Sequence, residues 1–356
     1  MQNKKYMPAP ALGFVKFYYF YHLFAKIDGI MKKIFAIAAA LICISAAAQE
    51  QTIKANWNKG EVVKYKMTDT NLKIQGEDTT EVKTTTATLV FKVLKASADS
   101  YKMSLTLKDL KYSDPSMDML NSIRSAKFGD TKIVYTTDQY GKLVSVDNLE
   151  KILSQGQKLL DPAMGLMQQE YGGNMTQEEY FSMYNTMKEV LSSPDFVMGS
   201  LTKYLRPFTF HGKQMEFDKR YEGQAEITSF VPGIECPITV NTCEFMEQDP
   251  ADSKKVVAYM GRQTADAGMV KKALIDAVKK TLLASGPMTE EAEKTLEEVA
   301  AAMDESKLSF NEGRNVKIDL TTGWPEVVAY GKILDITMDG VRSCKVTKQD
   351  IEKVAE

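Results

Sequence analysis

The strongest constraint on the fold is a period-two alternation of apolar and polar residues that recurs through most of the chain after residue 49. Such alternation places apolar side chains on one face of a strand and polar ones on the other, as in an antiparallel sheet with one buried face. The pattern predicts eleven strands, near residues 63–67, 87–93, 103–107, 133–135, 143–146, 225–231, 238–246, 254–262, 315–321, 326–338 and 341–348.

Two helical blocks interrupt these strands, near residues 147–206 and 266–306. The first carries capping signals, which are Asp147 with Glu150, Asp161-Pro162, Thr176 with Glu179, and Ser193-Pro194. The second holds a basic helix and then an acidic one. They form either a hairpin with complementary charges or two separately solvated faces. The sequence therefore predicts an α+β fold, a large curved antiparallel β-sheet (half-barrel-like) with two helical inserts.

The first 48 residues carry a targeting pattern. Met31-Lys32-Lys33 precedes an apolar run of eleven residues and then small residues up to Ala48, as a cleaved secretory signal requires. The run is shorter than the ~20 residues that span a bilayer. We therefore predict a signal peptide over 31–48, cleavage between Ala48 and Gln49, and a single domain over 49–356. Residues 1–30 are either sequence upstream of a mis-called start or an extended leader.

Charge narrows the classes of partner. The chain holds 45 Lys and Arg against 47 Asp and Glu, and removing residues 1–48 takes away six Lys and one Asp. The net charge then changes from −2 to −7, which disfavours a nucleic-acid or anionic-membrane partner. We expect an exported protein of the periplasm or cell envelope that is not an integral membrane protein after cleavage.

Motifs for familiar catalytic chemistry are missing from the sequence. After cleavage His211 is the one histidine, and no HExxH, GxSxG, GxGxxG, phosphate-loop or CxxC motif occurs. Because His211 lies beside two phenylalanines, we interpret it as a structural residue. We expect no cofactor, no metal site and no catalytic residue. Paired carboxylates for glycoside hydrolysis stay an alternative, since sequence gives no distances.

Methionine is unusually frequent, with 20 in the chain. Flexible methionine side chains suit irregular core packing, or an adaptable apolar binding surface. For the second interpretation the candidate ligand-cavity residues lie in the first helical block, and they are Met164, Met167, Met183, Tyr184 and Met187.

Two further predictions concern covalent chemistry. Cys243 and Cys344 are the pair that we expect to form a disulfide across neighbouring strands, if one forms; free thiols are the alternative. Asp78-Thr79-Thr80 resembles the short O-glycosylation pattern of Bacteroidota, which makes Thr79 a candidate acceptor.

Three segments carry a resemblance to a known class of proteins: Trp57-Asn-Lys-Gly60-Glu-Val-Val-Lys-Tyr65, Asp138-Gln-Tyr-Gly141-Lys-Leu-Val144 and Leu320-Thr-Thr-Gly323-Trp-Pro325. Together they resemble uncharacterised exported (periplasmic) proteins of Bacteroidota, in which the Ala48-Gln49 junction is also a common cleavage pattern. The order of strands and helical inserts resembles, at the level of fold, the half-barrel of periplasmic lipoprotein carriers.

Three functional hypotheses follow. The first is a non-enzymatic exported envelope protein that binds an apolar or lipid-like ligand between sheet and helices. The second is a cell-envelope interaction or scaffold protein, which uses its acidic outer face or the 266–306 hairpin to bind a protein partner. The third is a carboxylate-based hydrolase.

Overall fold

The computed structural model describes residues 50–170, 176–227, 238–264, 267–284, 288–305, 307–338 and 340–355. All belong to one compact unit, Gln49–Glu356. The predicted upstream extension 1–30, the signal peptide 31–48 and the Ala48-Gln49 cleavage site lie outside the described residues.

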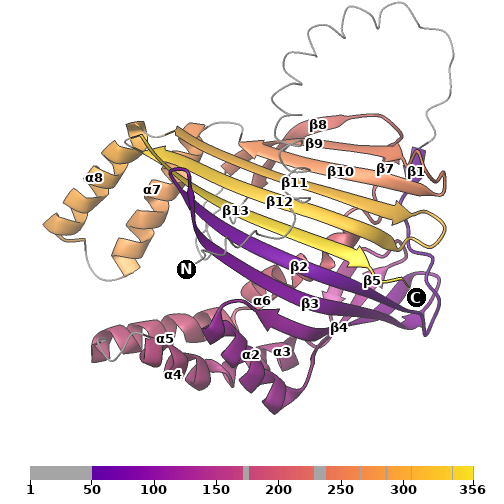
Figure 1. Cartoon of the computed structure of the whole chain (residues 1–356), viewed down its shortest axis with the longest axis horizontal. Helices are drawn as coiled ribbons and strands as arrows, with labels where there is room; N and C mark the ends of the chain where they lie inside the picture. The colour runs from indigo at the N-terminus through magenta and orange to yellow at the C-terminus, as the bar shows by residue number, and fades with distance from the viewer. Residues whose placement is uncertain are drawn as a thin grey trace, which may run out of the picture. The chain divides into compact units, whose positions relative to one another are not determined.

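The dominant element is a curved, unclosed antiparallel sheet of eleven strands (Figure 1). Its strand order is β6-β5-β4-β3-β2-β13-β12-β11-β10-β9-β8. Its strands are β2 (Val62–Gln75), β3 (Asp78–Ala96), β4 (Ser100–Tyr112), β5 (Thr131–Asp138), β6 (Leu143–Val146), β8 (Tyr221–Ile227), β9 (Ile238–Gln248), β10 (Lys255–Thr264), β11 (Lys307–Asp319), β12 (Pro325–Met338) and β13 (Val341–Lys353). They correspond to the eleven predicted strands, so the predicted α+β fold with a large curved antiparallel sheet is confirmed.

A second, two-stranded sheet was not predicted. It pairs β1 (Glu50–Thr52) with β7 (Gln214–Glu216) in antiparallel register. Strands of three residues carry too short an alternation to stand out in the sequence.

Both predicted helical blocks are present. The helices are α3 (Leu149–Gln157), α4 (Leu160–Glu170), α5 (Gln177–Ser192) and α6 (Pro194–Leu205), followed by the 3₁₀ turn η2 (Arg206–Phe208), and then α7 (Ala267–Ala284) and α8 (Glu290–Glu305). Helix α6 begins at Pro194, as the Ser193-Pro194 signal predicts, and ends at Leu205, two residues before Pro207.

The predicted capping box at Asp147 and Glu150 is wrong. Asn148 occupies the N-cap position of α3 without a side-chain capping hydrogen bond. The Asp147 carboxylate instead accepts hydrogen bonds from Thr136 and Ser145 and pairs with Lys102. These partners hold Asp147 against the neighbouring strands, away from the helix.

Helix α2 (Pro115–Phe128) was not predicted, although its start signal is in the sequence. Asp114 is the N-cap residue, its carboxylate accepts a hydrogen bond from the Met117 amide at 3.1 Å, and Pro115 opens the helix. This is the same Asp-Pro signal as at Asp161-Pro162. The helix has no buried residue, so it lacks the apolar periodicity that marks a packed helix.

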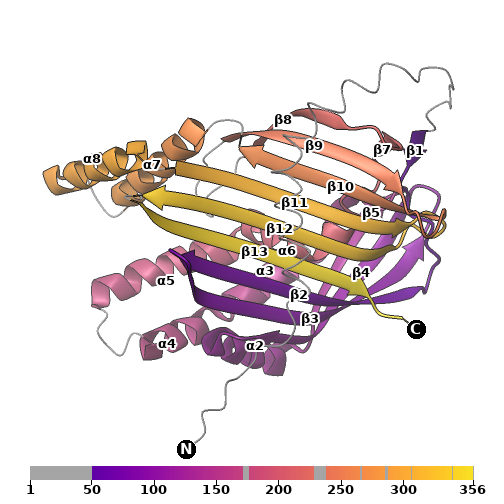
Figure 2. The same ribbon diagram turned by 45° about the horizontal axis from the view of Figure 1, so that its top comes forward.

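One face of the sheet, which we call the inner face, carries the apolar positions of every long strand. On β2 the exposure alternates, so that Val63, Tyr65 and Met67 are buried while their neighbours are exposed. Helix α6 and η2 pack on this face, inside the curve of the sheet (Figure 2). Burial of each large apolar side chain contributes about 2 kcal/mol to stability.

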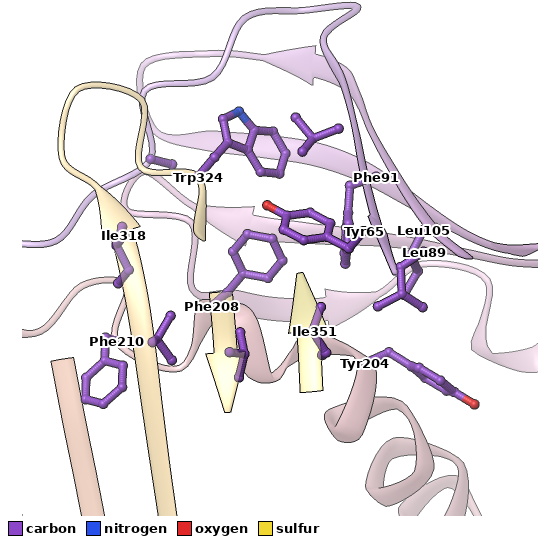
Figure 3. Close-up of a cluster of buried hydrophobic side chains, with 14 of the residues drawn as sticks. Tyr65, Leu89, Phe91, Leu105, Tyr204, Phe208, Phe210, Ile318, Trp324 and Ile351 are labelled. Atoms are coloured by element: carbon purple, nitrogen blue, oxygen red, sulfur yellow. The ribbon is translucent and has the colours of Figure 1, made fainter. Parts of the chain in front are cut away.

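The buried apolar side chains form two separate clusters. The first core gathers side chains of β2–β5, β9–β13, α6 and η2, and Tyr65, Phe91, Tyr204, Phe208, Trp324 and Ile351 belong to it (Figure 3). The second core lies where β10 ends and β11 begins, and α7 covers it. Its buried members are Ile238, Val240, Val270, Ala273, Leu308 and Phe310.

Candidate ligand-binding site

The three segments that carry the sequence resemblance meet at one end of the first core. The rings of Trp57 and Trp324 stack there, with centroids 4.6 Å apart. Gly141 lies against them, because an added Cβ would come within 2.9 Å of both Trp57 and His211. The segments therefore build a buried aromatic cluster, which fixes loops and strand starts.

His211 is part of this aromatic cluster and is only 2 % exposed. Its Nε2 donates to the carbonyl oxygen of Gly323 at 2.8 Å. Burial lowers the pKa of His211 to about 4, so the ring stays neutral at neutral pH. A neutral, enclosed imidazole tied to a backbone carbonyl agrees with the structural role predicted for it.

The five predicted cavity residues lie on α4 and α5. Met164 is fully buried, and the other four, Met167, Met183, Tyr184 and Met187, are half-buried. Helix α5 packs chiefly on α3, α4 and α6. The Tyr184 hydroxyl reaches Asp161 on α4 at 3.5 Å. The structure thus places these residues in a helix–helix layer, and their role in ligand binding stays a prediction.

The predicted disulfide between Cys243 and Cys344 is wrong, since both thiols are free. Cys243 lies on β9 and Cys344 on β13, and β10, β11 and β12 run between these strands. Adjacent strands are about 4.8 Å apart, so the two cysteines lie far beyond the ~6 Å Cα separation of a disulfide. The third cysteine after the predicted signal peptide, Cys236, lies outside the described residues.

Thr79, the candidate glycosylation site, is exposed near the start of β3, where it pairs with Ile74. Its hydroxyl is therefore accessible to a modifying enzyme. Modification at Thr79 stays a prediction.

Between the two cores the inner face carries polar and charged side chains, which we call the polar strip. They occupy two adjacent rows across the sheet and are Asp69, Asn71, Arg262, Glu312, Arg314, Tyr330, Lys332, Thr347 and Gln349. In one row Tyr330 pairs with Arg314 and Gln349. In the next row Glu312 pairs with Arg262 and Lys332.

Arg206 of η2 covers the polar strip. Its guanidinium carbon lies 3.6 Å from the ring centroid of Tyr330, and its Nη1 donates to Gln349 Oε1 at 2.8 Å. The guanidinium carbon of Arg314 lies 5.5 Å from the centroid of the same ring. Both guanidinium groups therefore lie within cation–π distance of the Tyr330 ring, which stabilises them.

Six of the nine residues of the polar strip stay partly accessible. Asn71, Arg262, Glu312, Arg314, Lys332 and Thr347 are half-buried, whereas the apolar positions on either side are mostly enclosed. Apolar side chains border the strip at both ends, with Met67 and Ile351 of the first core on one side and Phe310 and Leu334 on the other. The polar strip therefore separates two apolar regions of the inner face, and Leu334 is half-buried at its border.

Sequence reasoning missed the polar strip, although a signal for it exists. Along β11 the inner positions 308, 310, 316 and 318 are apolar, while 312 and 314 are Glu and Arg. Charged residues at inward positions of an alternating strand mark a break in the core. One strand alone does not show that such a break is significant. Its significance appears only when the charged positions of neighbouring strands are known to lie in the same rows of the sheet.

Among the described residues, no cluster of three or more His, Cys, Asp or Glu side chains has the geometry to hold a metal ion. Nor does that part of the chain contain a helix with the length and apolarity needed to cross a bilayer.

Comparisons with known proteins give distant likenesses. No family model matches the chain, and no curated protein matches it. A solved structure concerned with lipid–protein interactions in lipovitellin is similar with a TM-score of 0.32 and 6% identity, over 84% of this chain and 26% of that one. An outer membrane channel from Pseudomonas putida F1 is similar with a TM-score of 0.17 and 6% identity, over 88% of this chain and 100% of the channel. The chain thus spans about a quarter of the lipovitellin chain, and neither likeness defines a shared fold.

Proposed function

We propose that this chain is a non-enzymatic exported protein that binds an apolar or lipid-like ligand between the inner face of its sheet and the helices that cover it. One observation carries the proposal: two apolar cores on one face of the sheet are separated by a half-buried polar strip. A domain selected for stability alone would join the two cores into one.

The interruption is costly for folding. Removing charged side chains such as Arg314 and Glu312 from water opposes folding, even when they pair with each other. A row of apolar residues at the same positions would make the domain more stable. Binding of a ligand accounts for a face that keeps these charges partly accessible.

The apolar part of the ligand has a surface to occupy. Leu334 and Ile336 on β12 are half-buried on the inner face and pack at the margin of the second core. Covering them with hydrocarbon contributes about 25 cal/mol for each Å² removed from water. Binding sites of this kind combine an apolar lining with a few placed polar groups.

Export is part of the proposal. It rests on the signal pattern of residues 31–48 and on the net charge of −7 that remains after cleavage at Ala48. The ligand would then be met in the periplasm or cell envelope.

A neutral apolar probe tests the binding site. N-phenyl-1-naphthylamine fluoresces when it enters an apolar environment, and we expect it to bind the protein saturably. Leu334→Gln should weaken binding several-fold, because Leu334 lies on the inner face. Ile333→Gln is the matched control, since this neighbour on the same strand is also half-buried but faces the other side. Equal affinity of both variants and the unaltered protein contradicts the proposed site.

A second candidate function is that of an interaction protein, and one observation favours it. Helix α8 packs on α7 and β12, at the end of the sheet (Figure 1), and carries six glutamates at 290, 291, 293, 297, 298 and 305. A photo-crosslinking residue in place of Glu297 should then give a single protein adduct in living cells. A crosslink pattern identical to that from a residue placed at exposed Val82 contradicts this candidate.

A further inference from the structure

The polar strip and the arginine above it carry an excess of positive charge. We call Arg206, Arg262, Arg314 and Lys332 the inner cationic cluster. Among the described residues of the strip, two carboxylates face these four cations, those of Glu312 and Asp69. Asp69 is 7 % exposed, and burial raises its pKa, so it is a weakened counter-charge.

The contacts of Glu312 are too long to satisfy the guanidinium groups. Its carboxylate lies 3.6 Å from Arg262 Nη1 and 3.9 Å from Arg314 Nη2. Both distances are within Coulombic range but beyond that of a hydrogen bond. Arg314 Nη1 donates to the hydroxyl of Thr209, a neutral acceptor. The guanidinium groups of Arg262 and Arg314 therefore hold more donors than the Glu312 carboxylate accepts from.

Two of these donors are buried without a partner among the described residues, Nε of Arg262 and Nε of Arg314. The side chain of Arg314 is only 13% exposed. An unsatisfied buried N–H costs about 1–3 kcal/mol, and more when the group is charged. Native structures avoid that cost unless an acceptor arrives from elsewhere.

Electrostatics support the same conclusion. Burial and then the positive charge of Arg206 lower the pKa of Arg314 to about 10. Burial also lowers the pKa of Arg206 and of Lys332. Cations held in this way are stabilised by an added negative charge. Guanidinium groups offer planar, paired donors that match the oxygens of a carboxylate or a phosphate.

The apolar margins decide what kind of anion fits. Directly beyond Lys332 on the inner face of β12 come Leu334 and Ile336, which are half-buried beside the enclosed Phe310. A small inorganic anion would leave this half-buried hydrocarbon uncovered. An anion with an alkyl chain satisfies the arginines and covers the apolar margin at once.

We propose that Arg206, Arg262 and Arg314 bind the oxyanion head, a carboxylate or a phosphate, of an amphipathic ligand whose alkyl chain lies along Leu334 and Ile336. This assignment rests on the function proposed above and deepens it by naming the chemical class of the ligand. The inner cationic cluster selects the head, and the margin of the second core holds the chain.

Calorimetric titration of the full chain with three probes tests the assignment. The probes are dodecanoate, 1-dodecanol and inorganic phosphate, each below its aggregation concentration. A hydrogen bond to a charged group changes affinity by about 10-fold or more, so dodecanoate should bind at least about 10-fold more tightly than 1-dodecanol. Inorganic phosphate should bind more weakly than dodecanoate, because it lacks the chain.

Four variants make the test specific. Arg314→Met should reduce the preference for dodecanoate over 1-dodecanol to about 3-fold or less, while affinity for 1-dodecanol is retained. Arg262→Met, at a site 35% exposed, should act in the same direction and carries less risk to folding. Glu312→Gln should tighten dodecanoate binding, because it removes a competing carboxylate. Arg342→Met is the control, since Arg342 donates to Asp335 on the opposite face.

The outcomes separate the two proposals. Equal binding of dodecanoate and 1-dodecanol by the unaltered protein overturns the oxyanion site but leaves the apolar site standing. Phosphate binding as tight as that of dodecanoate, lost in Arg314→Met, keeps the anion site and overturns the lipid-like ligand. Binding of none of the three probes overturns both.

Discussion

The indole rings of Trp57 and Trp324 stack at a centroid separation of 4.6 Å and an interplanar angle of 26°, although 267 positions separate them in the chain. Trp57 precedes β2 and Trp324 precedes β12, and β13 joins these two strands in the sheet. The Trp324 indole N–H also donates to Glu61 Oε1 at 2.6 Å. The contact therefore fixes the N-terminal strands against the C-terminal strands at the point where the first core begins.

A substitution next to this contact should be severely destabilising. Gly323 has φ +74, and an added Cβ would lie 2.3 Å from the carbonyl oxygen of Lys54. Gly323→Ala therefore combines backbone strain with a backbone clash, and we expect a loss of at least about 2 kcal/mol in unfolding free energy. Chemical denaturation followed by tryptophan fluorescence measures it.

The matched control for that variant is Gly76→Ala. Gly76 has φ +64, but nothing lies within 4 Å of its added Cβ. The strain alone should cost about 1 kcal/mol. Equal losses for the two variants would show that the close approach of Lys54 does not matter.

Acid should weaken the fold through His211. Its pKa falls to about 4 in the folded protein, whereas the unfolded chain has the ordinary value near 6.5. Between these two pKa values His211 is protonated in the unfolded state but neutral in the folded state. The unfolding free energy is therefore highest above pH 6.5 and declines toward pH 4. The contribution of His211 between pH 7.5 and pH 5 is about 2 kcal/mol.

His211→Gln keeps an N–H donor for Gly323 but cannot titrate, so its stability should fall about 2 kcal/mol less over the same pH range. The direct readout is the NMR titration of the His211 ring. Its chemical shifts should stay constant down to pH 5. A midpoint near 6.5 in the folded protein contradicts the burial argument.

The cysteines should react as separate thiols. Unfolding the protein without reductant and alkylating it should modify both Cys243 and Cys344, because strands β10 to β12 lie between them. Peptide mapping by mass spectrometry measures this. A peptide that joins Cys243 to Cys344 rejects the strand order.

The proposed export predicts where the mature chain begins. Protein purified from the envelope fraction of its own host should begin at Gln49, which N-terminal sequencing or intact mass reports. An N-terminus at Met1 or Met31 contradicts cleavage.

A glycan on Thr79 should add a mass that disappears in Thr79→Ala.

Much of the sheet was predictable because period-two alternation is a local signal. Most of the eleven strands show it, and Thr-rich outer faces such as 84–86 strengthen it. Helix α2 was not predicted, because it has no buried residue and therefore shows no apolar periodicity. Its Asp114-Pro115 cap is the one local signal for it. The Cys243–Cys344 pairing failed because the order of strands in a sheet is not a local property.

The candidate site was less predictable than the fold. Met183 and Met187 were conspicuous in the sequence, yet they lie in a helix–helix layer. The inner cationic cluster brings Arg206 of η2 to Arg314 of β11, more than 100 positions away, and their proximity depends on strand order and on the path of η2. In the sequence each of these arginines looks like an ordinary surface residue. Only the order and register of the strands bring them together on the inner face.

The most direct test of the central claim is to identify what the protein carries. The protein, purified from its own host without detergent, is extracted with organic solvent, and the extract is analysed by mass spectrometry. We predict an amphipathic molecule with a carboxylate or phosphate head, near one equivalent for each chain, and much less of it from Arg314→Met. An extract from the unaltered protein that holds no such molecule would contradict the account.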